Sequence, residues 1–582
     1  MKHVKHKGDF CIIGGGMAGV CAAIAAARHG AKVILMQDRP VLGGNASSEI
    51  RMWICGAHGD NNRETGILEE IQMENLYRNM GLSFSVWDSI LYEKVKFEEN
   101  ITLLLNCSCM EADTIWDNTS KIPGKRIQSV KGWQLTTETW HTVEADLFAD
   151  CSGDSILAEL SGADYRIGRE AREEFQETIE PELKDSKTMG MSCLFQIRET
   201  DRPQPFIPPA WAEKYSTDSD LPYREHSSDS NFWWIELGGE DDCLHDGEEL
   251  RDKLLKIVFG VWDHMKNHGD HGVENWVIDW IGFLPGKRES RRCIGDYILT
   301  QNDVASEGKF HDLAAYGGWS MDDHFPAGFR YKEGYPTIFH PAPSPFGIPY
   351  RCMYSRNVNN LFFAGRNIST THAALSATRV MGTCAVIGQA VGTAAAIAAE
   401  KKLLPREIYE KEIPRLQQIL MEDDCYLPWH RRRVPALTKK AAILAASGSP
   451  EILRNGYDRT IGTEDNGWIC APGDWVQYSF DSEEEITSIR LVFDSNLNRK
   501  IHNMPCNYPL IQEGFHVPET LVKEFRIEYL DNRGNWATAL EVKENHQRLI
   551  KIRVNILTKG IRFIPVSSWG GDTIHIYAWD VQ

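Results

Sequence analysis

The sequence predicts an α/β fold that is interrupted by an α+β insertion and followed by an antiparallel β-sandwich. Near residue 1, an apolar strand, a glycine-rich turn, an Ala-rich helix and a second apolar strand follow one another. Apolar runs that end in glycine return near residues 153 and 365. After about residue 438, short alternating and β-branched runs separated by Asp, Asn and Gly replace this pattern, as is typical of antiparallel sheets.

The first strand covers residues 9–13, and a turn with three spaced glycines opens the helix that follows. Gly14, Gly16 and Gly19 have G-x-G-x-x-G spacing. In a βαβ unit these glycines allow a tight turn, close approach of backbone to a pyrophosphate, and close helix–strand packing, while the helix N-terminus faces the anion. Because the strand AKVILMQD completes such a unit, we predict a dinucleotide site that includes Gly14, Gly16, Met17, Ala18 and Gly19.

The second strand ends where this pattern expects an acidic residue for the ribose hydroxyls. Gln37 occupies that position and Asp38 follows it. A glutamine side chain can also hydrogen-bond a ribose diol, so we assign both residues to the nucleotide. The substitution does not separate NAD from FAD.

Later segments resemble flavoproteins. RPVLGGNASSEIRMW resembles the loop that the glutathione-reductase and fumarate-reductase types place against pyrophosphate and flavin. ITLLLNCSCM resembles the strand whose backbone, near Cys109, meets adenine, and ADLFADCSGD resembles the second dinucleotide signature. The segment that begins NLFFAGRNISTTHAAL resembles the late flavin-binding strand and helix. With GKRESRRCIGDY and IPYR, these segments resemble the FAD-dependent oxidoreductase family over roughly residues 8–405.

The resemblance implies a Rossmann-like FAD-binding fold, FAD as the cofactor, and a set of further FAD contacts. These contacts are Gly43, Gly44, Asn45, Ser47, Ser48, Cys109, Ser152, Gly153, Gly365, Arg366, Met381, Gly382 and Thr383. A helix that begins at Met381 beside the flavin C2 carbonyl would stabilise negative charge on reduced flavin through its free N–H groups and dipole.

Five segments follow from these patterns. Residues 1–160 and 350–405 form the two parts of a discontinuous FAD-binding domain, and residues 161–349 form the inserted α+β cap domain. Residues 406–437 form a helical connector, and residues 438–582 form the β-sandwich. GWICAPGDWVQYSF and IHIYAWDVQ resemble discoidin or galactose-binding modules, for which sugar binding and a structural role weigh evenly.

Composition and charge exclude several classes of binding partner and of structure for this chain. A formal net charge of −19 argues against a binder of nucleic acid or of anionic membranes. The first apolar run is the cofactor strand rather than a secretory segment, so we expect a cytoplasmic protein, although a trimmed signal peptide and a periplasmic location fit the same sequence. The apolar stretch 373–399 contains Arg379 and Gln389, which favours a buried helix over a membrane span. The 14 cysteines form no C-x-x-C pair, so we expect no redox-active dithiol.

His372 is the first catalytic candidate, because the resemblance places its segment beside the flavin and histidine titrates near neutral pH. It would act as a base or donor to a substrate oxygen; the alternative is a packing histidine. The other candidates are His58, Arg63, Arg292, His340 and Tyr350. Arg288 and Arg291 could join Arg292 in binding a carboxylate or a carbonyl, Arg351 could contact an FAD phosphate, and for each arginine a salt bridge between cap and core is the alternative.

One histidine cluster, DHMKNHGDHG, imitates a metal site. His264 and His268 lie one helical turn apart, and Asp270 and His271 follow. Solvated histidines at a helix end are commoner than metal ligands, and no fixed-spacing signature completes the set. We therefore expect no metal.

These observations predict an FAD-dependent oxidoreductase that oxidises a hydroxyl of a sugar, uronic acid or related small molecule by hydride transfer to flavin N5. The sequence leaves the electron acceptor open, and family habit suggests a homodimer. The alternatives are fumarate-reductase-like reduction of an unsaturated acid, redox-neutral flavin-assisted elimination, and a carbohydrate-binding protein with structural FAD.

Overall fold

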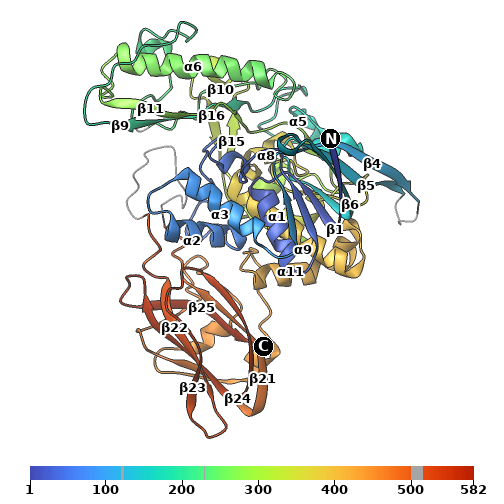
Figure 1. The fold of residues 1–582 in the computed structure, drawn as a ribbon, viewed down its shortest axis with the longest axis vertical. Helices are drawn as coiled ribbons and strands as arrows, with labels where there is room; N and C mark the ends of the chain where they lie inside the picture. The colour runs from blue at the N-terminus through green and yellow to red at the C-terminus, as the bar shows by residue number, and fades with distance from the viewer. Residues whose placement is uncertain (119–122, 229, 500–514) are drawn as a thin grey trace. The chain divides into compact units, whose positions relative to one another are not determined.

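A computed structural model describes residues 1–118, 123–228, 230–499 and 515–582, which form two compact units (Figure 1). Within these described residues, unit 1 contains residues 1–57 and 81–416. Unit 2 contains residues 58–80, 417–499 and 515–582. Residues 500–514, which belong to the β-sandwich domain predicted for residues 438–582, lie outside the described residues.

Unit 1 is built on a seven-stranded sheet with the strand order β3-β2-β1-β6-β5-β4, in which β18 also pairs with β6. The parallel strands are β1 (Lys2–Ile13), β2 (Val33–Met36), β3 (Ile101–Leu104), β6 (Thr139–Asp150) and β18 (Leu361–Phe363), and β4 (Cys107–Asp117) and β5 (Gly124–Gln134) pair antiparallel. The register aligns Ile13 with Met36 and Asp150, and Asp150 with Phe363. The loops that follow four of these strands therefore meet at one edge of the sheet.

Two details of the sheet differ from our expectation. The first strand begins at Lys2 rather than Asp9, because its N-terminal half pairs with β6 from Thr139 onward. ITLLLNCSCM, which we expected to be one strand, is divided between β3 and β4 by a break at Asn106, whose φ of 52° lies in the left-handed region.

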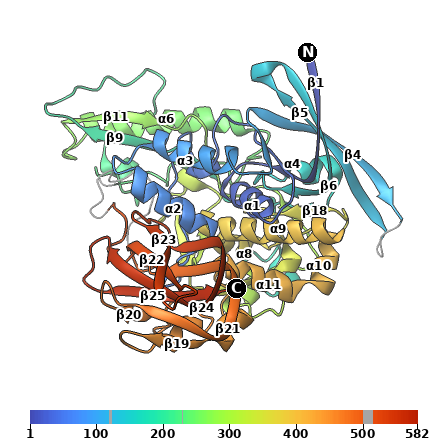
Figure 2. The same cartoon turned by 60° about the horizontal axis from the view of Figure 1, so that its bottom comes forward.

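Helices α1 (Met17–Arg28) and α9 (Met381–Lys401) lie side by side against this sheet (Figures 1 and 2). Glycines in α9 allow the close approach: a Cβ at Gly388 would lie 2.1 Å from the Ala18 carbonyl oxygen, and one at Gly392 would lie 2.2 Å from the Ala22 carbonyl oxygen. Among the described helices, α9 is long and apolar enough to cross a membrane, and 94% of its apolar window is buried inside the protein. The expected buried helix is therefore confirmed.

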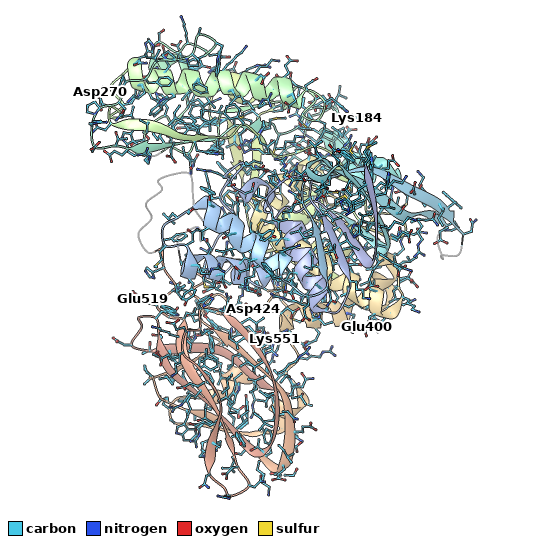
Figure 3. The ribbon with its side chains drawn as sticks, viewed as in Figure 1. Lys184, Asp270, Glu400, Asp424, Glu519 and Lys551 are labelled. Atoms are coloured by element: carbon cyan, nitrogen blue, oxygen red, sulfur yellow. The ribbon has the colours of Figure 1, made fainter. Side chains whose placement is uncertain are left out.

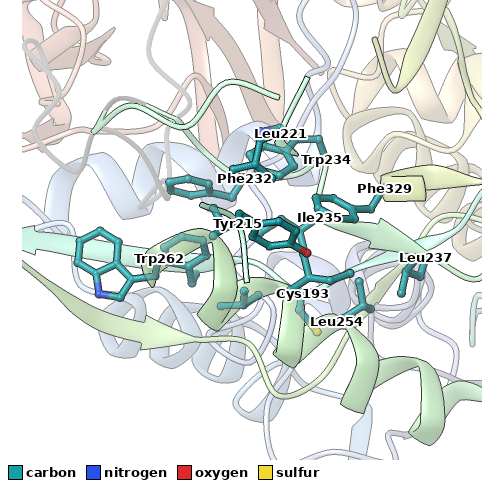
Figure 4. Packing of buried hydrophobic residues seen from close by; sticks show 14 of the residues in the cluster. Cys193, Tyr215, Leu221, Phe232, Trp234, Ile235, Leu237, Leu254, Trp262 and Phe329 are labelled. Carbon is teal, nitrogen blue, oxygen red and sulfur yellow. The ribbon is translucent and has the colours of Figure 1, made fainter. Parts of the chain in front are cut away.

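The insertion between the two halves of the sheet carries one long helix, α6 (Gly247–Asn267), and several short antiparallel sheets. These pair β9 (Phe195–Glu199) with β11 (Trp276–Ile281), β8 (Met191–Ser192) with β10 (Glu236–Leu237) and β12 (Gly286–Lys287), and β15 (Met321–His324) with β16 (Thr337–His340). An aromatic core that includes Tyr215, Phe232, Trp234 and Trp262 holds these elements together (Figure 4).

The remaining elements of unit 1 are short or lie at its periphery. They are α3 (Phe84–Lys96), α4 (Ile156–Ser161), α5 (Arg172–Phe175), α7 (Gln301–Ala305), α8 (His372–Thr378), α10 (Pro405–Lys411), β7 (Tyr165–Arg166), β13 (Arg292–Cys293), β14 (Leu313–Gly317) and β17 (Phe346–Pro349). The cysteines of the described ranges are free, so no disulfide links them.

Unit 2 contains an antiparallel sheet with the order β20-β25-β21-β24-β22-β23, and β19 pairs with β21. The strands are β19 (Ala442–Ala445), β20 (Trp468–Cys470), β21 (Val476–Phe493), β22 (Val522–Leu530), β23 (Trp536–Val542), β24 (Leu549–Ser568) and β25 (Ile574–Val581). Helix α12 (Ala436–Lys440) precedes them, and α11 (Ile413–Glu422) spans the boundary with unit 1 in the chain.

Unit 2 also contains α2 (Ile67–Arg78), which we expected within the first part of the FAD-binding domain. The Glu69 carboxylate is buried and accepts hydrogen bonds from Ser495 at 2.6 Å and from Arg499 at 2.5 Å. The ring of Tyr77 stacks on His546 with centroids 4.0 Å apart. Charge pairing and ring stacking thus attach an N-terminal helix to the C-terminal sheet.

Candidate functional site

The glycines of the turn after β1 differ in how closely the rest of the protein approaches them. A Cβ at Gly14 would lie 2.4 Å from the Cys151 carbonyl oxygen, and one at Gly19 would lie 1.9 Å from the Gly14 carbonyl oxygen, so the packing of the protein itself requires both glycines. Gly16 differs, because the nearest heavy atom to its Cβ position is the Gly44 Cα at 3.9 Å. Two backbone segments without side chains therefore face each other beside the N-terminus of α1, as a pyrophosphate cradle requires.

The N-terminus of α1 is free of protein acceptors. Within the described part of the chain, the first N–H groups of this helix donate to no acceptor outside it. At the start of α9, Gly382 donates its N–H to the Cys55 carbonyl oxygen at 2.8 Å, although we had assigned it to the flavin. The Thr383 hydroxyl in the same turn is buried and has no hydrogen-bond partner among the described residues. Both helix starts therefore retain polar groups that a bound dinucleotide would satisfy.

Gln37 braces the glycine-rich turn. Its Oε1 accepts a hydrogen bond from the Gly15 N–H at 2.6 Å, and its Nε2 donates to the Val41 carbonyl oxygen at 3.2 Å. The side chain is buried, whereas the neighbouring Asp38 is more than half exposed. Gln37 therefore stabilises the glycine-rich turn. Its position at the end of the second strand had suggested a contact with the ribose instead.

Several other cofactor candidates also stabilise the loops in which they lie. The Ser47 hydroxyl donates to the Gly44 carbonyl oxygen at 2.7 Å, and the Ser152 hydroxyl donates to Asp150 at 2.7 Å. Asn45 Nδ2 donates to the Lys287 carbonyl oxygen at 3.1 Å, and the Ser48 N–H donates to Asp88 at 3.1 Å. Cys109 lies in β4, where it pairs with Gly132 of β5. Gly43 bridges to Gly16, which joins the two glycine loops directly.

Arg366 lies over Gly153 at the end of β6. A Cβ at Gly153 would lie 2.7 Å from the Arg366 guanidinium, so a side chain cannot occupy that position. Arg366 pairs with Asp154 at 2.7 Å, and Lys287 pairs with the same carboxylate at 2.9 Å. Burial would raise the pKa of Asp154, but Arg366 and Lys287 hold it below its usual range. The Arg366 Nε is buried without a hydrogen-bond partner in the described residues, which leaves one donor for a ligand.

His372 begins α8 and is almost completely buried among acidic side chains. Its Nδ1 lies 2.9 Å from Glu289, its Nε2 lies 3.3 Å from Asp323, and its backbone N–H donates to Glu170 at 2.8 Å. Burial lowers the pKa of His372, but Glu289 and Asp323 outweigh it and raise the pKa well above its ordinary value. Both ring nitrogens thus lie within hydrogen-bond distance of a carboxylate, an arrangement that favours the protonated ring.

Glu180 is a member of this cluster that we did not predict. It is 1% exposed, and neither carboxylate oxygen has a hydrogen-bond partner among the described residues. Burial raises its pKa to about 7; His372 opposes this shift, and Glu170, Glu177 and Asp323 add to it. Only its place in an acid-rich run of sequence with Glu170 and Glu177 could have drawn attention to Glu180, because His372 and Asp323 come from distant segments.

The arginines of GKRESRR have protein partners. Arg292 is buried and pairs with Glu289 and with Glu170, the latter at 2.8 Å. Arg288 donates to the Ser192 hydroxyl at 2.9 Å and to the Trp233 carbonyl oxygen at 3.1 Å, and Arg291 donates to the Asp154 carbonyl oxygen at 3.2 Å. Arg292 thus joins the His372 cluster by holding its carboxylates.

A second charged network lies at the other end of α8. Asp322 bonds Arg379 at 2.9 Å and His324 at 3.3 Å, and His324 lies 2.6 Å from Glu236. Burial would raise the pKa of Asp322, but His324 and Arg379 hold it well below its usual range. Asp322 and Asp323 are consecutive in β15, so they point to opposite faces of the strand and reach the two ends of α8. In the sequence, only the consecutive residues Asp322, Asp323 and His324 could have indicated this network.

The remaining catalytic candidates lie outside the His372 cluster. Tyr350 is buried, donates to the Pro405 carbonyl oxygen at 2.8 Å, and has a pKa that burial raises well above its ordinary value. His340 lies in β16 opposite Met321. His58 and Arg63 belong to unit 2, where Arg63 donates to the Arg499 carbonyl oxygen. Arg351 pairs with Asp312 at 2.9 Å.

Comparisons with known proteins show the family to which the chain belongs. The family model described as FAD dependent oxidoreductase matches residues 9–420. A comparison with curated proteins found no match.

Several solved structures of carbohydrate-binding modules share a weak likeness with part of the chain. The family 32 module of Streptococcus pneumoniae EndoD is 18% identical, covers 26% of this chain and 97% of its own, and has a TM-score of 0.20. The family 32 module of C. perfringens NanJ, in complex with galactose, is 11% identical, covers 25% and 94%, and has a TM-score of 0.18. At these scores, the ligand of the present chain has to be argued from its own residues.

Substitution of Gly16 by valine tests the cradle. Because the Cβ position of Gly16 is open in the protein, Gly16→Val should fold but lose bound flavin, since the side chain would fill the space between Gly16 and Gly44. The ratio of flavin absorbance to protein absorbance measures retention, and thermal unfolding checks the fold. Gly247→Val, at an open position in α6, is the matched control and should stay yellow. A fully yellow Gly16→Val protein would show that the pyrophosphate binds elsewhere.

Proposed function

The chain belongs to the FAD dependent oxidoreductase family, and we propose that it oxidises a hydroxyl group of a neutral sugar or a related polyhydroxylated compound. On this proposal the Rossmann-like fold of unit 1 holds FAD along the glycine turns, and the cluster around His372 manages the proton of the substrate hydroxyl. The resemblance of GWICAPGDWVQYSF and IHIYAWDVQ to galactose-binding modules motivates the substrate class.

The observation that carries the proposal is a buried carboxyl group, that of Glu180, whose oxygens have no hydrogen-bond partner among the described residues and whose pKa burial raises to about 7. Oxidation of an alcohol removes a hydride from carbon and a proton from oxygen, so the site needs a base. Bound FAD supplies the acceptor for the hydride and its two electrons. Glu180, with a pKa of about 7 and no competing hydrogen bond among the described residues, is suited to take up the proton.

We assign two other members of the cluster, His372 and Asp323, to charge compensation and to substrate binding. His372 donates to both Glu289 and Asp323, so its ring has no lone pair with which to remove a proton. We therefore assign His372 the role of a fixed cation that orients Asp323. The Asp323 side chain is 23% exposed, more than its partner His372, and is placed to accept a hydrogen bond from a substrate hydroxyl.

Charge in the cluster favours a neutral substrate. Five carboxyl groups, those of Glu170, Glu177, Glu180, Glu289 and Asp323, accompany the buried cations His372 and Arg292. Two more exposed arginines also interact with these carboxyl groups: Arg166 with Glu170 at 3.6 Å, and Arg169 with Glu180 and Asp323. A uronate would add a further negative charge to this environment, whereas the hydroxyls of a neutral sugar can donate to carboxylates. We therefore expect neutral sugars to react in preference to uronic acids.

The engagement of the arginines supports oxidation over the reverse reaction. Reduction of an unsaturated acid would need arginines that are free to hold its carboxylates and to donate a proton. Arg288, Arg291 and Arg292 each bond to groups of the protein.

Anaerobic absorbance of the purified protein tests the proposal. A panel of neutral sugars, uronic acids and glycosides is added while the flavin band is followed, and we expect a neutral sugar to bleach it. The dithionite-reduced protein is then mixed with unsaturated acids. Recolouring by such an acid with no response to sugars would overturn the proposal in favour of a reductase, and the absence of any ligand-driven change would favour structural FAD.

His372→Ala should retain FAD but slow substrate-driven bleaching by about 100-fold or more, because Asp323 loses its partner and the cluster loses a cation. Stopped-flow absorbance under anaerobic conditions measures the rate. His245→Ala, at an exposed histidine of the cap, is the control. Bleaching at the wild-type rate would remove His372 from the mechanism.

Glu180→Gln should also slow bleaching by about 100-fold or more and should abolish its pH dependence. In the wild type, the rate should rise as pH increases through about 7, because the ionised carboxylate is the base. Glu182→Gln, at an exposed glutamate two residues away, should behave as the wild type. An unchanged pH profile in Glu180→Gln would assign the proton to another group.

The same variant has a signature in stability. The folded protein holds a proton on Glu180 up to pH 7, whereas an ordinary glutamate releases it near 4.5. This linkage favours folding below about pH 4.5 and is lost as pH rises to 7, by about 3 kcal/mol. Glu180→Gln lacks the loss, so its melting temperature should exceed that of the wild type at pH 8 and match it near pH 5.

A further inference from the structure

Three histidines and an aspartate converge in the cap, outside the site described above. The ligand atoms of Asp218, His226, His264 and His271 all lie within 4.8 Å of one another. His264 lies in the last turn of α6, and His271 lies in the loop that follows, directly after Asp270, which Figure 3 labels. Asp218 begins the short helix η3 (Asp218–Asp220), so four separate positions of the chain meet at one point.

The spacing of these atoms matches four-coordinate binding of a small ion. From Asp218 Oδ1, the distances to Nε2 of His264, His271 and His226 are 3.1, 3.7 and 3.8 Å. Ligands held at 2.0–2.2 Å around a tetrahedral zinc ion are about 3.4 Å apart. The three ring centroids lie 4.8–5.0 Å apart with planes inclined by 56–70°, so the rings surround a common point instead of stacking as a pair.

Two of the histidines are oriented through their other ring nitrogen. The Nδ1 of His264 lies 3.0 Å from the Tyr215 carbonyl oxygen, and the Nδ1 of His226 lies 2.6 Å from the Arg224 carbonyl oxygen. A carbonyl oxygen only accepts, so each Nδ1 carries the proton and each Nε2 presents a lone pair to the centre of the group. Backbone carbonyls hold metal-binding histidines in this way in known sites.

A group of this kind is costly when nothing binds it. The His264 side chain is fully buried, and the Nε2 of His271 is buried with no hydrogen-bond partner among the described residues. Buried polar atoms are nearly always hydrogen-bonded or coordinated. The unsatisfied Nε2 therefore points independently to a ligand at the centre of the group.

We propose that Asp218, His226, His264 and His271 bind one divalent transition-metal ion, for which the ligand set of three imidazole nitrogens and one carboxylate favours Zn²⁺. Four protein ligands leave no position for a reacting water, so the ion is structural. It joins the loop 217–226 to the C-terminal end of α6, next to the aromatic core that contains Tyr215 and Trp262.

This proposal replaces our expectation that the segment DHMKNHGDHG binds no metal. His268 and Asp270, which we considered with His264 and His271, are not members of the group, and His268 pairs with Asp263 at 3.4 Å. The missing ligands come from Asp218 and His226, which precede His264 by 46 and 38 residues.

Zinc content of the full-length, FAD-loaded protein tests the site. The protein is stripped with a chelator, titrated with Zn²⁺ against a competing chromophoric chelator, and assayed by mass spectrometry after gel filtration. We expect one zinc per chain for the wild type. Asp218→Ala and His271→Ala should each weaken binding by about 100-fold or more, because each removes one of four metal bonds. His268→Ala, at a neighbouring histidine outside the group, should bind as the wild type.

Flavin content and the melting temperature show whether each variant folds, and Asp218→Asn provides a variant that preserves the size of an exposed side chain. Removal of zinc should lower the melting temperature of the wild type but not that of Asp218→Asn. The proposal fails if the stripped wild type binds neither Zn²⁺ nor Co²⁺ at micromolar concentrations, or if the ligand variants bind as tightly as the wild type. Either result leaves the redox proposal unaffected, because the flavin measurements do not depend on this group.

Discussion

The register of the parallel sheet is the constraint on which unit 1 depends. Ile13, Met36, Asp150 and Phe363 end four neighbouring strands at one level, so the loops that follow them share one edge of the sheet. The glycine turn, Gln37, Gly153 and Gly365 all lie in these loops. A shift of one residue in any pairing would move a loop by a strand step of about 3.3 Å and turn its side chains to the other face. Close packing of α1 on α9 through Gly388 and Gly392 then sets the position of both helices.

Buried charge is the second organising feature, and it has a cost that local pairing only partly offsets. Around His372, carboxyl groups outnumber the cations, and removing such groups from water disfavours their ionised forms. His372 and Arg292 compensate Glu289, Glu170 and Asp323 by direct contact. Glu180 has no such contact among the described residues; burial raises its pKa, and the nearby Glu170, Glu177 and Asp323 add to the rise. The carboxylate of Glu180 can therefore take up one proton near neutral pH.

The features that could be predicted from the sequence are those that depend on residues close together in the chain. The spacing of Gly14, Gly16 and Gly19, the second strand and the late helix are local patterns, and the family match confirms the oxidoreductase family and its FAD. The buried α9 was predictable in the same way, because its sequence is mostly apolar but contains Gln389, which favours a buried helix over a membrane span. The resemblance to the oxidoreductase family identified His372 as a residue of interest, although it could not show that both ring nitrogens of His372 are engaged.

The features that the sequence did not predict depend on contacts between distant segments. Burial raises the pKa of Glu180, and the charges that modify this shift include His372, 192 residues away. Asp218 meets His264 across 46 residues. Gln37 fits the position of a ribose ligand, but its side chain is used by Gly15 and Val41. In each case the residue type was visible, and its partners, which decide its protonation or its role, were supplied by tertiary structure.

The placement of α2 has a consequence for how the protein can be divided. Its buried face, with Glu69, Ile71 and Leu76, belongs to the unit that holds the C-terminal sheet, although the helix lies between two N-terminal segments of unit 1. A single cut in the chain therefore cannot separate the units. A truncation near residue 438 would remove Ser495 and Arg499, which donate hydrogen bonds to the buried Glu69, and an isolated C-terminal fragment would lack its helix. The chain is interlaced, so duplication or exchange of the sheet domain as an independent module would require the helix to move with it.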